Sequence, residues 1–245
     1  MPPRKNTETE GKAGLAPEHG SSIDLAFQQI RQLIVHGNLA PGTWIIETDL
    51  GNRLGMSRTP VRGALQWLQR EGYVIEQKQR LNSRMMVAPL THEDARELYA
   101  IVARIEGLAG INAAQLPRAE RMTIVETIRA INEELTDISR SGDLRGRSIF
   151  DLDLDFHRVI VEAGAGPRLK QLHNAVKPQT ERYWRLYASN IQGQLHIAAS
   201  EHNRIIQAIR AGKPQEAEAA LIENWVNGSQ RIASVIAQQG ERGTW

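Results

Sequence analysis

The sequence predicts a mainly α-helical fold: an N-terminal winged helix-turn-helix followed by an all-α antiparallel six-helix bundle. Apolar residues recur at helical spacing along most of the chain, two short apolar-rich runs flank residue 80, and no strand signal appears from Leu90 onward. We therefore expect a disordered polar arm at 1–21, the winged helix-turn-helix at 22–90, the bundle at 91–238 and a tail at 239–245.

Two helices are predicted at the start of the first domain, the second shorter than the first. The first ends near Gly37, the second stops at Gly55, and APGT at 40–43 forms a turn between them. Their apolar stripes are Ile23, Phe27, Ile30 and Ile34, and then Ile46, Leu50 and Leu54.

The stretch GMSRTPVRGAL, from Gly55 to Leu65, predicts a third helix that begins at the N-cap Ser57 and tolerates a proline in its first turn. The buried stripe is expected to consist of Val61, Leu65 and Leu68. The opposite face carries Arg58, Thr59, Arg62 and Gln66. Arginine forks match guanine in the major groove, glutamine matches adenine, and a threonine methyl can contact thymine. A solvated basic helix face would show the same pattern, so both interpretations stay open here.

The hairpin and the bundle follow. Strands are expected at 73–76 and 85–88, around the polar loop QKQRLNS. Thr91, followed by Glu93 and Asp94, predicts the N-cap of the first bundle helix. Further helices are expected at 118–140, 145–163, 167–189, 194–211 and 214–238. Six such helices can enclose a central cavity.

Composition narrows the class of protein. With 41% hydrophobic and 24% charged residues, the chain is typical of a globular protein. The absence of cysteine excludes disulfide scaffolds and thiolate zinc sites and favours a cytoplasmic location. No apolar run approaches the ~20 residues of a membrane helix, and the N-terminus lacks the apolar core of a signal peptide. Residues 22–90 carry eight Lys and Arg against five Asp and Glu, so the basic excess lies where a polyanion would dock.

Asp153 and His157 are four residues apart on one predicted helix, so they lie on one face. They could chelate a metal ion together, but on spacing alone an Asp–His pair is more often a surface ion pair. Spacing alone leaves both possibilities open.

The motifs together resemble a known family. SRTPVRGALQWLQREGYV, preceded by LAPGTWIIETDLGNRLGM, strongly resembles the winged-helix DNA reader of GntR-family bacterial transcription regulators. The signatures of the FadR-type ligand-sensing domain of that family, known as FCD, are ELYAIVARIEGLAG, DLDFHRVIVEAGAGPRL and EHNRIIQAIRAGKPQEAEAAL. Six sensor helices resemble the vanillate-regulator subgroup. The resemblance implies a homodimer that binds a pseudo-palindromic double-stranded DNA operator, represses transcription, and responds to a small-molecule effector, a carboxylate.

The resemblance also implies DNA contacts. Arg58 and Arg62 occupy operator-contacting positions, and Ser57 and Thr59 match flanking ones. At the wing tip, where the family has glycine, we place Arg84, which could enter the minor groove, bind phosphate, or remain a solvated loop residue.

In the sensor, Asp153, His157 and His202 match three of the four FCD metal-ligand positions, and Asn224 stands where the family has histidine. An amide oxygen is a poorer ligand for zinc or nickel than imidazole, so we expect a weak site that also accepts manganese.

The carboxylate-clamping arginine of the family aligns with Val102, and Arg104 lies roughly 200° further around the helix. Arg182, Tyr183 and Arg185 are alternative clamp candidates, although charged helix faces are usually only solvated.

Two other functions remain open at the level of sequence. An Asp/His/His site with an open position would suit a metal-dependent enzyme. A degenerate sensor would leave a constitutive architectural DNA binder.

Overall fold

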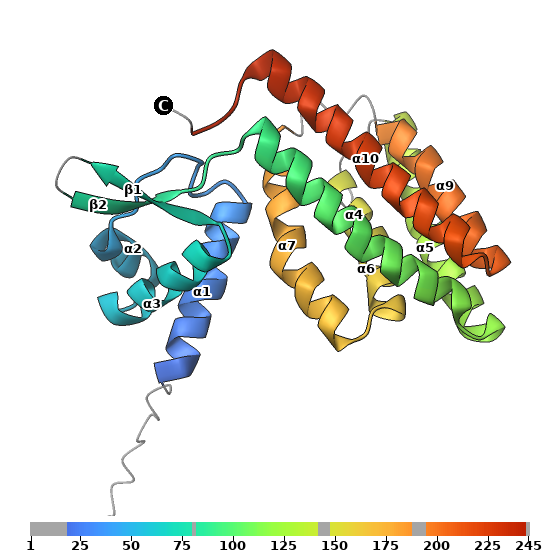
Figure 1. The fold of residues 1–245 in the computed structure, drawn as a ribbon, viewed down its shortest axis with the longest axis horizontal. Helices are drawn as coiled ribbons and strands as arrows, with labels where there is room; N and C mark the ends of the chain where they lie inside the picture. The colour runs from blue at the N-terminus through green and yellow to red at the C-terminus, as the bar shows by residue number, and fades with distance from the viewer. Residues whose placement is uncertain (1–18, 80–81, 142–147, 188–194, 244–245) are drawn as a thin grey trace, which may run out of the picture.

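The computed structural model describes residues 19–79, 82–141, 148–187 and 195–243. It has the predicted architecture, a small winged helix-turn-helix beside a larger helical bundle (Figure 1). Residues 1–18 of the predicted arm lie outside the described residues. The first helix begins at residue 19, so residues 19–21 are helical and do not belong to a disordered arm. Among the described residues, no helix is long and apolar enough to cross a membrane.

The N-terminal domain is built from α1 (His19–Val35), α2 (Glu47–Leu54) and α3 (Arg58–Arg70). Most residues of the predicted stripes form its core, in which Ile30, Val61 and Leu68 are fully buried, while Ile23 is only partly buried. Ser57 holds the N-cap position of α3, but its hydroxyl makes no capping hydrogen bond. Ile46 was predicted to pack inside α2; instead it is the N-cap residue and is 56% exposed.

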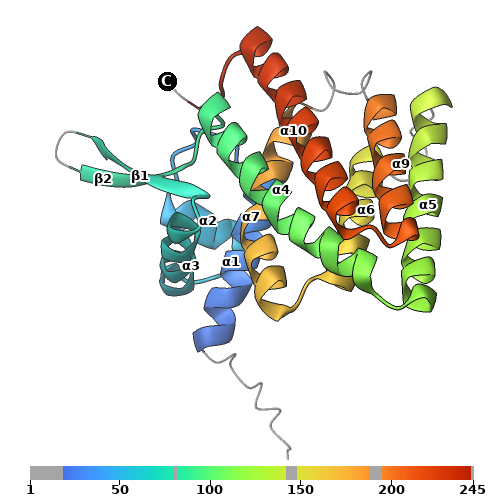
Figure 2. The same cartoon turned by 45° about the vertical axis from the view of Figure 1, so that its right-hand side comes forward.

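The wing is an antiparallel pair, β1 (Val74–Gln79) and β2 (Asn82–Val87), that projects away from the bundle (Figures 1 and 2). The strands are longer than predicted, because backbone pairing continues through polar residues that a two-stranded ribbon leaves in solvent. Arg84 pairs with Gln77 within the ladder. Its placement at the wing tip is therefore wrong, and the connection is at 80–81, outside the described residues.

The described part of the bundle contains six helices close to the predicted ranges. They are α4 (His92–Gln115), α5 (Arg118–Ser141), α6 (Ile149–Gly164), α7 (Pro167–Leu186), α9 (Leu195–Ala211) and α10 (Pro214–Gln239). Thr91 caps α4 as predicted, its hydroxyl accepting from the Asp94 amide. The helices α4 and α10 run side by side, and α7 stands between the bundle and α1 (Figures 1 and 2).

The helix α7 and the tail join the two domains. Gln179 on α7 donates to the backbone carbonyl of Glu71, and Arg182 donates to that of Ala88. Beyond α10, Arg242 pairs with Leu90 through two backbone hydrogen bonds, and Gly243 then meets Gly42. A Cβ on Gly42 would lie 2.6 Å from the Gly243 Cα, so this close approach requires glycine.

Candidate nucleic-acid interface and metal centre

The polar face of α3 points into solvent. The side chains of Arg58 and Arg62 are 62% and 57% exposed, whereas Val61 and Leu65 on the opposite face are buried. The periodicity of the stretch explains this arrangement, because its apolar residues all lie on the core side. A helix anchored in this way presents a rigid row of hydrogen-bond donors.

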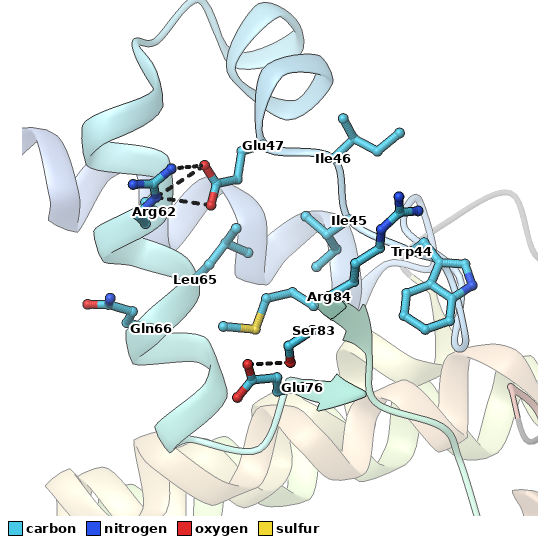
Figure 3. A pocket seen from close by; sticks show the side chains of 11 residues that line it. Trp44, Ile45, Ile46, Glu47, Arg62, Leu65, Gln66, Glu76, Ser83 and Arg84 are labelled. Carbon is cyan, nitrogen blue, oxygen red and sulfur yellow. Dashed lines mark hydrogen bonds and ion pairs between the residues drawn. The ribbon is translucent and has the colours of Figure 1, made fainter. Parts of the chain in front are cut away.

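A cleft of about 580 Å³ separates α3 from the wing (Figure 3). Arg62 and Gln66 line it from the helix, while Arg84 lines it from β2. Trp44 and Ile46, in the segment before α2, also lie along this cleft. The structure thus brings Arg84 near the α3 face, although from the strand and not from a loop tip.

Glu47, at the start of α2, holds the two arginines. Arg62 donates from Nε and from a terminal nitrogen to the carboxylate at 2.9–3.2 Å (Figure 3). Arg58 lies 3.6 Å from the same carboxylate. The hydrogen bond from Arg62 lowers the pKa of Glu47, so the pair is ionised near neutral pH. Glu47 thereby orients the Arg62 fork in the absence of a ligand.

In the bundle, α6 and α9 bring Asp153, His157 and His202 together. Their ligand atoms lie within 4.8 Å of one another. The exposed fractions are 9% for Asp153, 2% for His157 and 0% for His202. This is the convergence expected of a site that could hold a metal ion.

Each imidazole uses its Nδ1 in a hydrogen bond, so its Nε2 is the nitrogen left to bind a metal ion. The Nδ1 of His157 lies 2.5 Å from a Glu106 oxygen, and the Nδ1 of His202 lies 3.1 Å from the Asn132 side-chain oxygen. The buried Nε2 of His202 has no hydrogen-bond partner and lies 3.4 Å from Asp153. Burial lowers the pKa of His202 well below its ordinary value, so its imidazole is neutral, as a metal ligand must be. These residues fit a divalent metal.

The buried carboxylate of Glu106 on α4 accepts hydrogen bonds from three side chains next to this site, one of which is His157. Its carboxylate also accepts from His173 at 2.9 Å and from the Trp225 indole at 2.7 Å. Burial acts to raise the pKa of Glu106, but the charge and hydrogen bond of His157 outweigh it, so the pKa is lowered. Glu106 raises the pKa of His157 in turn, although burial opposes this.

Asn224 on α10 is oriented by a different carboxylate. Its amide donates to Glu201 at 2.8 Å, and Glu201 also accepts from Asn227 and Arg231. Asn224 is 6% exposed, and its amide nitrogen is used by Glu201.

The candidate clamp residues are dispersed. Val102 is in the apolar core, and Arg104 is exposed on α4. Arg182 and Tyr183 are used at the domain junction, Tyr183 through its hydroxyl with Thr91 and Asp94. Of these candidates, Arg185 alone lines a small cavity with Asp153.

Two family models match the chain. The model described as "Bacterial regulatory proteins, gntR family" matches residues 23–80, and the model described as "FCD domain" matches residues 97–225. The chain belongs to the GntR family. As a GntR-family protein with an FCD domain it is a DNA-binding transcription regulator, and the metal-dependent enzyme is excluded.

Individual proteins agree with this membership. The chain is 31% identical to the probable D-xylose utilization operon transcriptional repressor of Paenarthrobacter nicotinovorans, covering 79% of this chain and 82% of the relative. It is 25% identical to the repressor NanR of Klebsiella aerogenes, and the match covers 81% of this chain and 80% of that relative. The fold matches E. coli McbR/YncC with a TM-score of 0.65 at 19% identity, covering 89% of this chain and 98% of that one.

Two residues of this GntR regulator that hold predicted site residues were not identified from the sequence: Glu47 and Glu106. Each lies beside a predicted site residue only after folding, since Glu106 is 51 positions from His157. Glu47 and Arg62 come from different helices and are 15 positions apart. The only sequence signal for Glu106 was a charged residue on the apolar side of a predicted helix, between Ile105 and Ala109.

Proposed function

We propose that this regulator binds a pseudo-palindromic operator as a homodimer and represses transcription until an effector binds its bundle. The observation that carries the DNA-binding mode is the exposed row of Arg58, Thr59, Arg62 and Gln66 on α3, beside a cleft whose other wall carries Arg84. This geometry suits a helix in the major groove and a basic ribbon along the adjacent backbone. Ser57, one residue before α3, would contact phosphate.

An apolar groove supports the homodimer. It lies between α4 and α10, has a volume of about 290 Å³, and includes Ala100, Val226 and Ala233 in its lining. Val226 is 44% exposed, and Ile101 and Leu108 on α4 are 39% and 50% exposed. A twofold copy of this face would bury these side chains, and two-fold symmetry of the protein would match the symmetry of the operator.

The sensor would hold zinc, nickel or manganese through Asp153, His157 and His202. The unpartnered Nε2 of His202 supports this proposal, because a buried acceptor without a partner is rare unless a ligand uses it. The metal would supply a Lewis-acidic centre for an effector oxygen. Asn224 would contribute at most a weak fourth ligand, because an amide oxygen is neutral and a poorer ligand than imidazole. Its amide nitrogen donates to Glu201 and leaves the oxygen as the ligand atom.

Operator binding can be tested after selecting a binding site from a random duplex library. Arg62→Ala should weaken binding to that site by about 1–3 kcal/mol and relax base preference at one position in each half-site. Arg84→Ala should weaken binding more evenly across sequences. Arg129→Ala removes a similarly exposed arginine on α5 and is the matched control. Wild-type affinity and specificity in Arg62→Ala would contradict the major-groove mode.

The metal is tested by calorimetric titration of zinc into chelator-treated protein. His157→Ala should abolish zinc binding, whereas His196→Ala, an exposed histidine on α9, should not change it. Equal zinc affinity in His157→Ala and wild type would exclude this site.

A further inference from the structure

Lys177 on α7 is a buried ammonium group beside the candidate metal site. Its residue is 6% exposed, and its Nζ lies 5.1 Å from the centre of the Trp225 ring. Within the described parts of the chain, no carboxylate forms an ion pair with it. Lysine is rarely buried to this extent without a partner, because removing an ammonium from water is costly unless an anion compensates.

The nearby carboxylates are engaged with other cations and donors. Glu106 is used by His157, His173 and Trp225. Four other carboxylates each lie within ion-pair distance of an arginine or lysine: Asp151 and Glu181 near Arg185, Glu162 near Lys170, and Asp155 near Arg158. Asp153 lies beside His202 in the metal-ligand cluster. The cation–π contact with Trp225 holds the ammonium in place without neutralising it.

Lys177 also lies where solvent reaches the sensor. It lines a cleft of about 460 Å³ between α6 and α7, together with Leu154, His173 and Asn174. The carboxylates Asp151, Asp155, Glu162 and Glu181 also line this cleft, each within ion-pair distance of an arginine or lysine. It also lines a small adjoining cavity with Asp153, next to the edge-to-face pair of Phe150 and Trp184. The larger cleft has the size of a small-molecule site. A ligand that enters it would meet the ammonium close to a candidate metal ligand.

We propose that Lys177 is the residue that binds the anionic group of the effector, a small carboxylate that enters between α6 and α7. This inference rests on the proposed sensor function, and it places the cation on α7, since the α4 position expected for a clamp holds Val102 in the apolar core. An ammonium is a point charge and not a planar fork, so Lys177 would bind one carboxylate oxygen and leave the second free for the metal.

Calorimetry on full-length, zinc-loaded protein tests this proposal with acetate, succinate, citrate and inorganic phosphate as probes. We expect wild type to bind at least one carboxylate more tightly than phosphate. Lys177→Met should weaken that binding at least tenfold, and Lys177→Arg, which keeps the charge, should retain most of it. Lys213→Met, which removes an exposed cation paired with Glu216 far along the chain, is the control.

Zinc titration of Lys177→Met separates this inference from the metal site itself. Wild-type zinc affinity, combined with lost carboxylate binding, supports Lys177 as the anion anchor. Carboxylate binding by Lys177→Met equal to wild type, or lost zinc binding in Lys177→Met, would overturn it. The proposal would also be overturned if wild-type protein takes up zinc normally but binds none of the three carboxylates. That result would contradict the role of Lys177 and would leave the proposed metal site standing.

Discussion

At the scale of single residues, carboxylates orient the side chains that carry function. Glu47 holds the Arg62 fork on the exposed side of α3 that we propose meets DNA, and Glu106 holds His157 with its Nδ1 occupied. In each case the acid comes from a different helix than its partner. Such outer contacts fix the rotamer and, for histidine, the tautomer that a ligand meets.

Glu106→Gln should lower the free energy of unfolding by about 3–5 kcal/mol, because it removes one partner of a buried ion pair. Glu106 raises the pKa of His157, so this stabilisation is present below the unfolded-state value near 6.5 and is lost as pH rises through the raised pKa. Urea unfolding with chelator present should therefore show a larger wild-type advantage at pH 6 than at pH 9. An equal difference at both pH values would mean that His157 is uncharged in the folded protein.

Asn224→His should tighten zinc binding, since imidazole is a better zinc ligand than an amide oxygen. Glu201 already accepts from the Asn224 amide at 2.8 Å, so it could accept the Nδ1–H of the new ring and orient its Nε2. Calorimetry should show higher affinity and slower removal of zinc by chelator. Asn227→His, whose amide also donates to Glu201, controls for an added histidine nearby. No gain over Asn227→His would show that position 224 does not face the metal.

At the scale of elements, close helix crossings and one bridging helix shape the bundle. α7 carries His173 and Lys177 toward the bundle and, further along the helix, Gln179 and Arg182 toward the winged helix. Pro178 lies between the two groups and removes one backbone donor inside the helix. A ligand that shifts α7 would thus act directly on the backbone of the DNA-binding domain.

Gly164→Ala should destabilise the α4–α6 crossing by about 1–3 kcal/mol. A Cβ at this position would lie 2.0 Å from the Ala109 carbonyl oxygen, so the two helices would have to separate. Gly166→Ala is the control, because a Cβ there meets nothing within 4 Å. Urea midpoints should fall for the first variant and stay near wild type for the second. A neutral Gly164→Ala would show that the helices are further apart in solution.

At the scale of the whole molecule, the winged helix and the bundle are joined by α7 and by the tail beyond α10. The tail reaches Leu90, at the end of the wing, and Gly42, before α2. The two domains are therefore tied together at separate points along the sequence, and assembly through the bundle would set the spacing of the two α3 helices in a dimer.

Val226→Asp should convert a dimer to a monomer in sedimentation velocity at micromolar concentration, because it places a charge in the apolar α4–α10 groove. Operator affinity should fall with it. Leu172→Asp is the control, since Leu172 is 57% exposed on α7, away from the groove. A wild-type protein that sediments as a monomer would contradict the proposed dimer, and a Leu172→Asp monomer would move its interface to α7.

The sequence by itself determined the elements and the residues with local signatures. The helical periodicity, the N-cap positions Ser57 and Thr91, and the Arg58–Arg62 and Asp153–His157 pairs all depend on neighbours within one or two turns. Arg84 was wrongly placed at the wing tip because the register of the two strands is set by their backbone pairing. The polar residues of a solvated ribbon leave no apolar pattern from which that register could be predicted. Only tertiary structure decided which carboxylate meets which partner. Glu106 reaches His157 across 51 positions, and Lys177 reaches Trp225 across the packed bundle, through contacts that arise only when distant helices pack together.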